Sequence, residues 1–313
     1  MPFFSYICSM ERAIINFDTV DNYNKLYGFT TRHPFVTVVN LRNAERTLTH
    51  FTATYGLYAL FLKNSSACTV RYGRRSYDYQ EGTVVSFAPG QKVDVDVRQP
   101  EDPASRNVIG ILFHPDLVYG TPLAERLNKY SFFSYAESEA VHLSEEERAK
   151  FTECIEKIDQ ELDHAVDRHS ADIICVNIQV LLEYMERFYD RQFTTRHKVN
   201  SLVVAEFEKR LKEYFNENRS AGPIPGVAYF AEKANLSPGY FGDLIRKETG
   251  SSPKDLIALR LIDVAKQRLR SGDDDVAEIA YSLGFEYPAH FSRMFKRITG
   301  MSPVAYRRQE NMN

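Results

Sequence analysis

The sequence predicts a two-domain α+β protein, in which a β-rich N-terminal domain precedes an all-α C-terminal domain. Three observations support this prediction. Short β-branched and aromatic runs lie between residues 30 and 115, amphipathic stretches follow within 144–190, and one helical pattern occurs twice after residue 226. No apolar run reaches the roughly 18 residues that a membrane-spanning helix needs, so we expect no membrane segment.

The β-rich region consists of short runs separated by turn signals such as Glu81-Gly82 and Pro89-Gly90. The runs are residues 35–39, 56–62, 68–72, 83–87, 93–97 and 108–113. Strands at this spacing are typical of a β-sandwich or a small β-barrel. We assign residues 1–143 to this domain and expect a small barrel.

Residues 144–190 predict a pair of helices. Ser144 and Glu147 have the spacing of a capping box, and each helix carries one apolar stripe. The stripes are Phe151, Ile155, Ile158 and Leu162, then Ile174, Ile178, Leu181 and Met185. Two interpretations remain open: the stripes pack on the β-rich domain, or they form a homodimer interface, since their spacing also suits helix pairing. The polar segment 191–200 is expected to be a linker.

The C-terminal domain, residues 201–313, contains the repeated pattern. Residues 227–231 match 276–280, and Thr-Gly-Ser-Ser-Pro at 249–253 matches Thr-Gly-Met-Ser-Pro at 299–303. Each copy has a short helix, a turn and a second helix, which is the arrangement of a helix-turn-helix unit. We expect these units at 227–250 and 276–300. A long helix at 253–271, with Pro253 in its first turn, should join them.

The turn and the core have the same chemistry in both copies. Asn235 and Gly284 belong to the residue types that adopt a left-handed backbone at least cost. An apolar residue that locks the two helices, Leu236 or Phe285, follows directly. The core faces of the second helices contain Phe241 in the first unit, and Phe291 and Phe295 in the second.

The outward faces of the second helices carry basic side chains, among them Arg246, Arg293 and Lys296. Residues 196–313 contain 19 Lys and Arg against 15 Asp and Glu, whereas residues 1–195 contain 20 against 27. The C-terminal domain is therefore the one expected to bind double-stranded DNA. The alternative for a helical repeat, a solenoid fragment or a protein-binding bundle, is disfavoured because two copies are too few for a solenoid.

The segment from about Ser201 to Arg308 resembles the DNA-binding domain of the AraC/XylS family of bacterial transcription regulators. The matching residues are Ile279-Ala280, Leu283-Gly284-Phe285, residues 290–296 (His-Phe-Ser-Arg-Met-Phe-Lys), residues 300–303 (Gly-Met-Ser-Pro) and Tyr306-Arg307. The N-terminal domain resembles the cupin-like sensor domains of the same family, best in residues 81–90. The resemblance implies a cytoplasmic, dimeric regulator, more commonly an activator, that works with RNA polymerase and responds to a small-molecule effector.

The resemblance also implies which residues contact DNA. The base-facing positions are Gly239, Gly242, Asp243 and Arg246 in the first unit, and Ala289, His290 and Arg293 in the second. Residues better placed for phosphates are Lys247, Ser292, Lys296, Arg297 and Arg307. The first set departs from good base readers, because glycine has no side chain and Asp243 repels phosphate, although it could accept a hydrogen bond from cytosine N4. Arg293 is expected to contact guanine through two hydrogen bonds.

The β-rich domain is expected to hold no catalytic group, no metal and no cofactor. His33, His50 and His114 lack the His-x-His spacing of metal-dependent cupins. Two alternatives remain open: a cupin-type enzyme, or a ligand-independent dimerisation module, fused to the DNA-binding domain. Several aromatic residues could line a pocket for a sugar or an aromatic effector, but we favour the core for most of them. They are Tyr55, Tyr58, Phe61, Tyr72, Tyr77, Tyr79 and Phe87.

Overall fold

The computed structural model describes residues 13–64, 68–72, 75–76, 82–97, 106–165, 167–216, 223–271 and 274–310. The chain divides into two compact units, Met1–Gln192 and Phe193–Asn313. None of the helices in these ranges combines the length and the apolar character that crossing a lipid bilayer requires.

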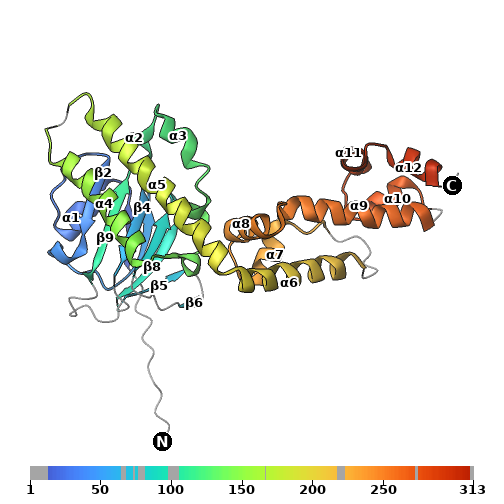
Figure 1. Ribbon diagram of the computed structural model, residues 1–313, viewed down its shortest axis with the longest axis horizontal. Helices are drawn as coiled ribbons and strands as arrows, with labels where there is room; N and C mark the ends of the chain where they lie inside the picture. The colour runs from blue at the N-terminus through green and yellow to red at the C-terminus, as the bar shows by residue number, and fades with distance from the viewer. Residues whose placement is uncertain are drawn as a thin grey trace, which may run out of the picture. The chain divides into compact units, whose positions relative to one another are not determined.

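The first unit is built on two five-stranded sheets (Figure 1). The strands are β1 (Ala13–Phe17), β2 (Val36–Asn40), β3 (His50–Tyr55), β4 (Tyr58–Lys63), β5 (Cys68–Tyr72), β6 (Arg75–Ser76), β7 (Thr83–Phe87), β8 (Lys92–Val97), β9 (Val108–Phe113) and β10 (Val141–His142). One sheet has the order β1-β3-β8-β5-β6, and the other has the order β10-β7-β4-β9-β2. Neighbouring strands are antiparallel, except that β1 runs parallel to β3.

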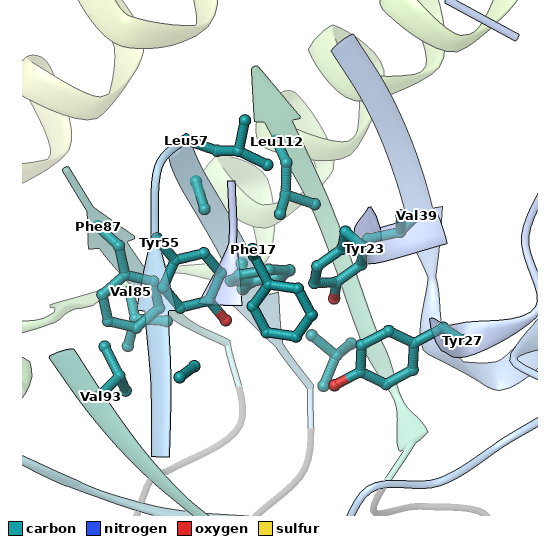
Figure 2. Packing of buried hydrophobic residues seen from close by; sticks show 14 of the residues in the cluster. Phe17, Tyr23, Tyr27, Val39, Tyr55, Leu57, Val85, Phe87, Val93 and Leu112 are labelled. Atoms are coloured by element: carbon teal, nitrogen blue, oxygen red, sulfur yellow. The ribbon is translucent and has the colours of Figure 1, made fainter. Parts of the chain in front are cut away.

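The two sheets are not joined by strand pairing anywhere in the described ranges. The prediction of a closed small barrel is therefore wrong for this part of the chain, and the sandwich is the arrangement found. Tyr55 of β3 shares one apolar core with Val85 and Phe87 of the second sheet (Figure 2). Side chains that alternate along each strand supply this core from both sheets.

Of the aromatic residues considered from the sequence, Tyr55, Phe61 and Phe87 belong to this core, whereas Tyr58 packs against Phe113 and Phe133. Tyr77, Tyr79 and the side chain of Tyr72 lie outside the described residues.

Strand β4 is buried on both of its faces. Ala59, Phe61 and Lys63 alternate with Leu60 and Leu62, and all five are at most 6% exposed. The second sheet is covered on its other side by helix α4 (Glu145–Leu162), which packs against β2 and β9. A strand that is buried on both faces loses the polar alternation of a surface strand, which explains its continuous apolar run.

The shorter helices of the first unit are α1 (Val20–Tyr27), α2 (Pro115–Val118) and α3 (Pro122–Leu127), and its long helices are α4 and α5 (Ser170–Thr195). The capping box at the start of α4 is confirmed. The amide of Glu147 donates to Ser144 Oγ at 3.2 Å, and the amide of Ser144 donates to Glu147 Oε2 at 2.9 Å. Arg191 of α5 pairs with the same glutamate, with its Nη2 atom 2.6 Å from Oε2.

The apolar stripes of α4 and α5 point into the first unit. None of their eight residues is more than 7% exposed: Phe151, Ile155, Ile158, Leu162, Ile174, Ile178, Leu181 and Met185. Their assignment to a dimer interface is therefore wrong, and the packing interpretation is the correct one. The physical reason is that a sheet with one apolar outer face must be covered, and these two helices are amphipathic enough to cover it.

The second unit is helical. Its helices are α6 (His197–Asn216), α7 (Val227–Ala234), α8 (Pro238–Thr249), α9 (Pro253–Ser271), α10 (Val276–Ser282), α11 (Pro288–Thr299) and α12 (Pro303–Glu310). Because α5 ends at Thr195 and α6 begins at His197, most of the segment expected to be a linker is helical. Phe207 of α6 lies edge-on against Phe230 and Phe241, with ring centroids 5.0 and 5.3 Å away.

Candidate nucleic-acid interface

The turns of both helix-turn-helix units contain a residue with a left-handed backbone and an equivalent backbone hydrogen bond. Asn235 ends α7 with φ of 59°, and Gly284 follows α10 with φ of 89°. The amide of Leu236 donates to a carbonyl oxygen in the last turn of α7 at 2.9 Å, and the amide of Phe285 makes the equivalent bond to α10 at 3.0 Å. Such bonds satisfy carbonyl groups that the end of a helix leaves open. The two turns are therefore built alike.

The second helices of the two helix-turn-helix units, α8 and α11, also end alike. The hydroxyl of Thr249 donates to the carbonyl oxygen of Ile245 at 2.7 Å, and that of Thr299 donates to Phe295 at 2.8 Å. The glycines that follow have φ of 74° and 82°. The Thr-Gly sequence thus stops each helix by the same combination of a side-chain bond and a left-handed glycine.

Helix α8 presents few side-chain donors on its outward face. Gly239, Gly242 and Asp243 are half-buried, whereas Arg246 and Lys247 are exposed. A Cβ atom at Gly242 would meet nothing within 4 Å, so this glycine borders open space. Nη1 of Arg246 lies 3.6 Å from Oδ1 of Asp243, which offsets part of the positive charge on this face.

Helix α11 combines a buried aromatic face with an exposed basic face. Phe291 and Phe295 are fully buried, and their rings pack edge to face at 5.7 Å. Five of the predicted contact residues are exposed together on this helix: Ala289, His290, Arg293, Lys296 and Arg297. Ser292 is half-buried beside them. This face carries three permanent positive charges and no acidic residue, so it is the stronger electrostatic candidate of the two.

Arg307 is placed differently from the other predicted phosphate contacts. Its Nη2 atom donates to the backbone carbonyl oxygen of Asp274 at 2.6 Å, and the residue is half-buried. The bond connects α12 to the residues just before α10. Arg307 therefore has a structural role within the second helix-turn-helix unit, because it bonds α12 to the start of α10.

Two exposed tyrosines of the second helix-turn-helix unit were not singled out from the sequence. Tyr287 directly precedes the helix and is 55% exposed, and its ring centroid lies 5.5 Å from that of His290. Tyr281 of α10 is 52% exposed. The available signal was an aromatic residue outside the apolar pattern of either helix. Their hydroxyls could donate to phosphate oxygens at the edge of a groove.

The three histidines considered from the sequence, His33, His50 and His114, each have a local structural role. The ring of His33 accepts a hydrogen bond from the amide of Phe35, and burial lowers its pKa. His50 pairs with Asp96 across β3 and β8, and His114 caps α2. Within the described ranges, no group of three or more His, Cys, Asp or Glu residues is arranged to hold a metal ion.

Comparisons with known proteins agree with the helical pattern of the second unit. A family model described as a helix-turn-helix domain matches residues 230–309. The chain is 22% identical over 229 residues to LumQ of Photobacterium leiognathi, described as a probable transcriptional regulator. The matched stretch covers 72% of this chain and 82% of LumQ. The chain is 34% identical over 110 residues to YobQ of Bacillus subtilis (strain 168), an uncharacterized HTH-type transcriptional regulator. That match covers 31% of this chain and 46% of YobQ, so the chain spans less than half the length of that relative.

Among solved structures, the DNA-binding domain of the global transcriptional factor AdpA in complex with a target DNA is 28% identical. The matched stretch covers 35% of this chain and 90% of the AdpA domain, with a TM-score of 0.30. The motifs of the sequence, the two equivalent turns and the matching family model all concern the same residues. The C-terminal part of this chain is thus an AraC-type helix-turn-helix domain, the kind of domain found in AraC/XylS-family transcription regulators.

Proposed function

We propose that the protein is a sequence-specific DNA-binding transcription regulator. The observation that carries this proposal is the exposed basic face of α11. This helix follows the left-handed turn at Gly284, and its opposite face is formed by the fully buried Phe291 and Phe295. A rigid helix with such a face can enter the major groove of DNA with its N-terminal residues nearest the bases. In this proposal, Arg293 contacts a guanine, His290 and Ala289 line the same groove, and Lys296 and Arg297 bind phosphates.

In this proposal the two helix-turn-helix units contribute differently to DNA binding. Helix α8 has glycines and a paired arginine at its base-facing positions, so it contributes close backbone approach and phosphate binding rather than base recognition. Helix α9 has 19 residues, which gives a rod of roughly 28 Å at ~1.5 Å per residue. With the breadth of the units added, both second helices could lie about 34 Å apart and enter successive major grooves.

We further propose a cytoplasmic homodimer that activates transcription with RNA polymerase. Because the predicted apolar stripes are buried, the proposed dimer surface is the outer face of α5. Ile173, Val176 and Val180 are 43%, 60% and 42% exposed there, and an open groove runs on past Tyr184 and Arg187. A twofold axis would place this stripe against its own copy, so one face suffices for both partners.

The test is selection of DNA sequences from a random duplex pool by the purified full chain, with the Arg293→Ala variant run in parallel. We expect an enriched motif whose defined bases are contacted by α11, and we expect the variant to lose the preference for guanine within it. Enrichment of no motif by the unaltered chain would contradict sequence-specific binding. A motif that is identical for both proteins would show that α11 does not contact bases through Arg293.

A further inference from the structure

The first turn of α11 carries small and uncharged side chains at the end that the proposed function places nearest the bases. The helix begins at Pro288, and its N-cap residue, Tyr287, makes no side-chain capping hydrogen bond. Ala289 and His290 follow, and both are exposed. The first side chain with a permanent charge is that of Arg293, about one turn further on. The chemistry of the first turn therefore differs from that of the rest of the basic face.

Ala289 points away from the buried side of the helix. At about 100° per residue, Arg293 lies opposite the midpoint of Phe291 and Phe295, and Ala289 lies about 40° to one side of Arg293. Both phenylalanines are fully buried in one apolar cluster, which fixes the rotation of α11 about its axis. The methyl group of Ala289 and the side chain of Arg293 are therefore neighbours on the outward face, about 6 Å apart along the helix axis.

Local contacts hold the start of α11 in one conformation. The amide of His290 donates to the carbonyl oxygen of Tyr287 at 2.9 Å, and the two rings meet edge to face with their centroids 5.5 Å apart. Pro288, at the first helical position, has a fixed backbone φ. A surface that is ordered before binding loses little conformational entropy when it binds. Ala289 is thus presented to a partner at a defined position.

The side chain of Ala289 restricts what it can recognise. A methyl group has no hydrogen-bond donor or acceptor, so its only favourable contact with a base edge is apolar. In the major groove, the apolar group that a base presents is the methyl group on C5 of thymine. The repeated pattern gives a comparison within the chain, because α8 has Gly239 at the position equivalent to Ala289. A glycine has no methyl group to make this contact.

We propose that Ala289 makes α11 a reader of the methyl group on C5 of a pyrimidine, within about two base pairs of the guanine contacted by Arg293. The spacing follows because ~6 Å along the helix corresponds to roughly two base-pair steps of ~3.4 Å. Two bases carry this group: thymine, and cytosine that is methylated on C5. The inference rests on the proposed function and names a feature of the DNA that the protein selects.

The test is competition titration of the full chain with the selected duplex, in which thymines are replaced one at a time by deoxyuridine. This replacement removes only the methyl group. We expect one replacement, within about two base pairs of the guanine, to weaken binding about fourfold, which is the factor for one buried methyl group. No weakening at any position, or a selected motif without thymine at that distance, would overturn the proposal.

A second pair of duplexes distinguishes the two sources of the methyl group. Cytosine and 5-methylcytosine, each paired with guanine, replace the thymine at the sensitive position. We expect 5-methylcytosine to bind about fourfold more tightly than cytosine, for the same reason. Equal binding of these two duplexes would overturn the reading of methylated cytosine and support thymine as the base that is read.

Variants connect the methyl group to Ala289. Ala289→Gly should abolish the difference between thymine and deoxyuridine and keep the preference for guanine, whereas Arg293→Ala should do the reverse. The matched control is Ala305→Gly, at an exposed alanine near the start of α12, which introduces the same backbone freedom and should keep both preferences. Full discrimination against deoxyuridine by Ala289→Gly would overturn the assignment to this residue. The deoxyuridine titration itself requires no variant, so a loss of stability in Ala289→Gly does not prevent the test.

The results for the unaltered chain distinguish this inference from the proposed function. Selection of a motif whose binding is indifferent to deoxyuridine would contradict only the inference and leave sequence-specific DNA binding standing. Selection of no motif would overturn both.

Discussion

Nη1 of Arg246 lies 3.6 Å from Oδ1 of Asp243, one helical turn apart on the outward face of α8. The carboxylate both offsets the guanidinium and repels any phosphate that approaches. We therefore expect Asp243→Asn to tighten binding to DNA of any sequence and to make the slope of log affinity against log salt steeper by about one. Fluorescence anisotropy at several salt concentrations measures both quantities.

The matched control for this substitution is Asp263→Asn on α9. Asp263 also has a basic partner three residues on, with Nζ of Lys266 3.9 Å from its Oδ1. Its removal should leave the salt dependence nearly unchanged, because it is not on a second helix of either unit. Equal effects of the two substitutions would mean that Asp243 has no particular position against the DNA.

Arg293 and Lys296 are both exposed on α11 but should behave differently. Arg293→Ala should weaken binding to the selected duplex by about 10- to 100-fold and relax the preference for guanine at one position. Lys296→Ala should weaken binding to selected and unrelated duplexes to a similar extent. Competition titrations with duplexes substituted one base pair at a time distinguish these results. An equal loss on every duplex for Arg293→Ala would make it a phosphate contact.

Two Gly→Ala substitutions in the helical unit Phe193–Asn313 should change the unfolding free energy in opposite directions. Gly284 has φ of 89°, a backbone conformation in which alanine is strained, so Gly284→Ala should cost about 1–2 kcal/mol of unfolding free energy. Gly242 lies within α8 beside open space, so Gly242→Ala should stabilise by about 0.5–1 kcal/mol. Urea denaturation followed by circular dichroism measures both. Destabilisation by both would indicate that α8 is packed more tightly than the structure shows.

Helix α5 offers a direct separation of self-association from folding. Val180→Lys, on the exposed stripe, should convert a dimer into a monomer while the unfolding free energy stays nearly the same. Ile178→Ala, at a fully buried side chain, should instead cost about 2–5 kcal/mol of stability. Analytical ultracentrifugation and denaturant unfolding report the two effects. A Val180→Lys protein that sediments like the unaltered chain would place any dimer contact elsewhere.

Local chemistry made much of the second unit predictable. The left-handed backbone at Asn235 and Gly284 was expected from residue type, and the structure has positive φ at both. The capping box at Ser144 and Glu147 was predictable for the same reason. In each case the decisive contacts lie within about one helical turn along the chain, so the residues concerned are readable side by side.

The sequence by itself determined the repeated helical pattern, the position of the turns and the basic side chains of α11. Only the tertiary structure decided that the sheets form an open sandwich, that the stripes of α4 and α5 face inward, and that Arg307 bonds to Asp274. The physical reason is that periodicity shows which face of an element is apolar, whereas the partner of that face depends on segments far apart in the chain.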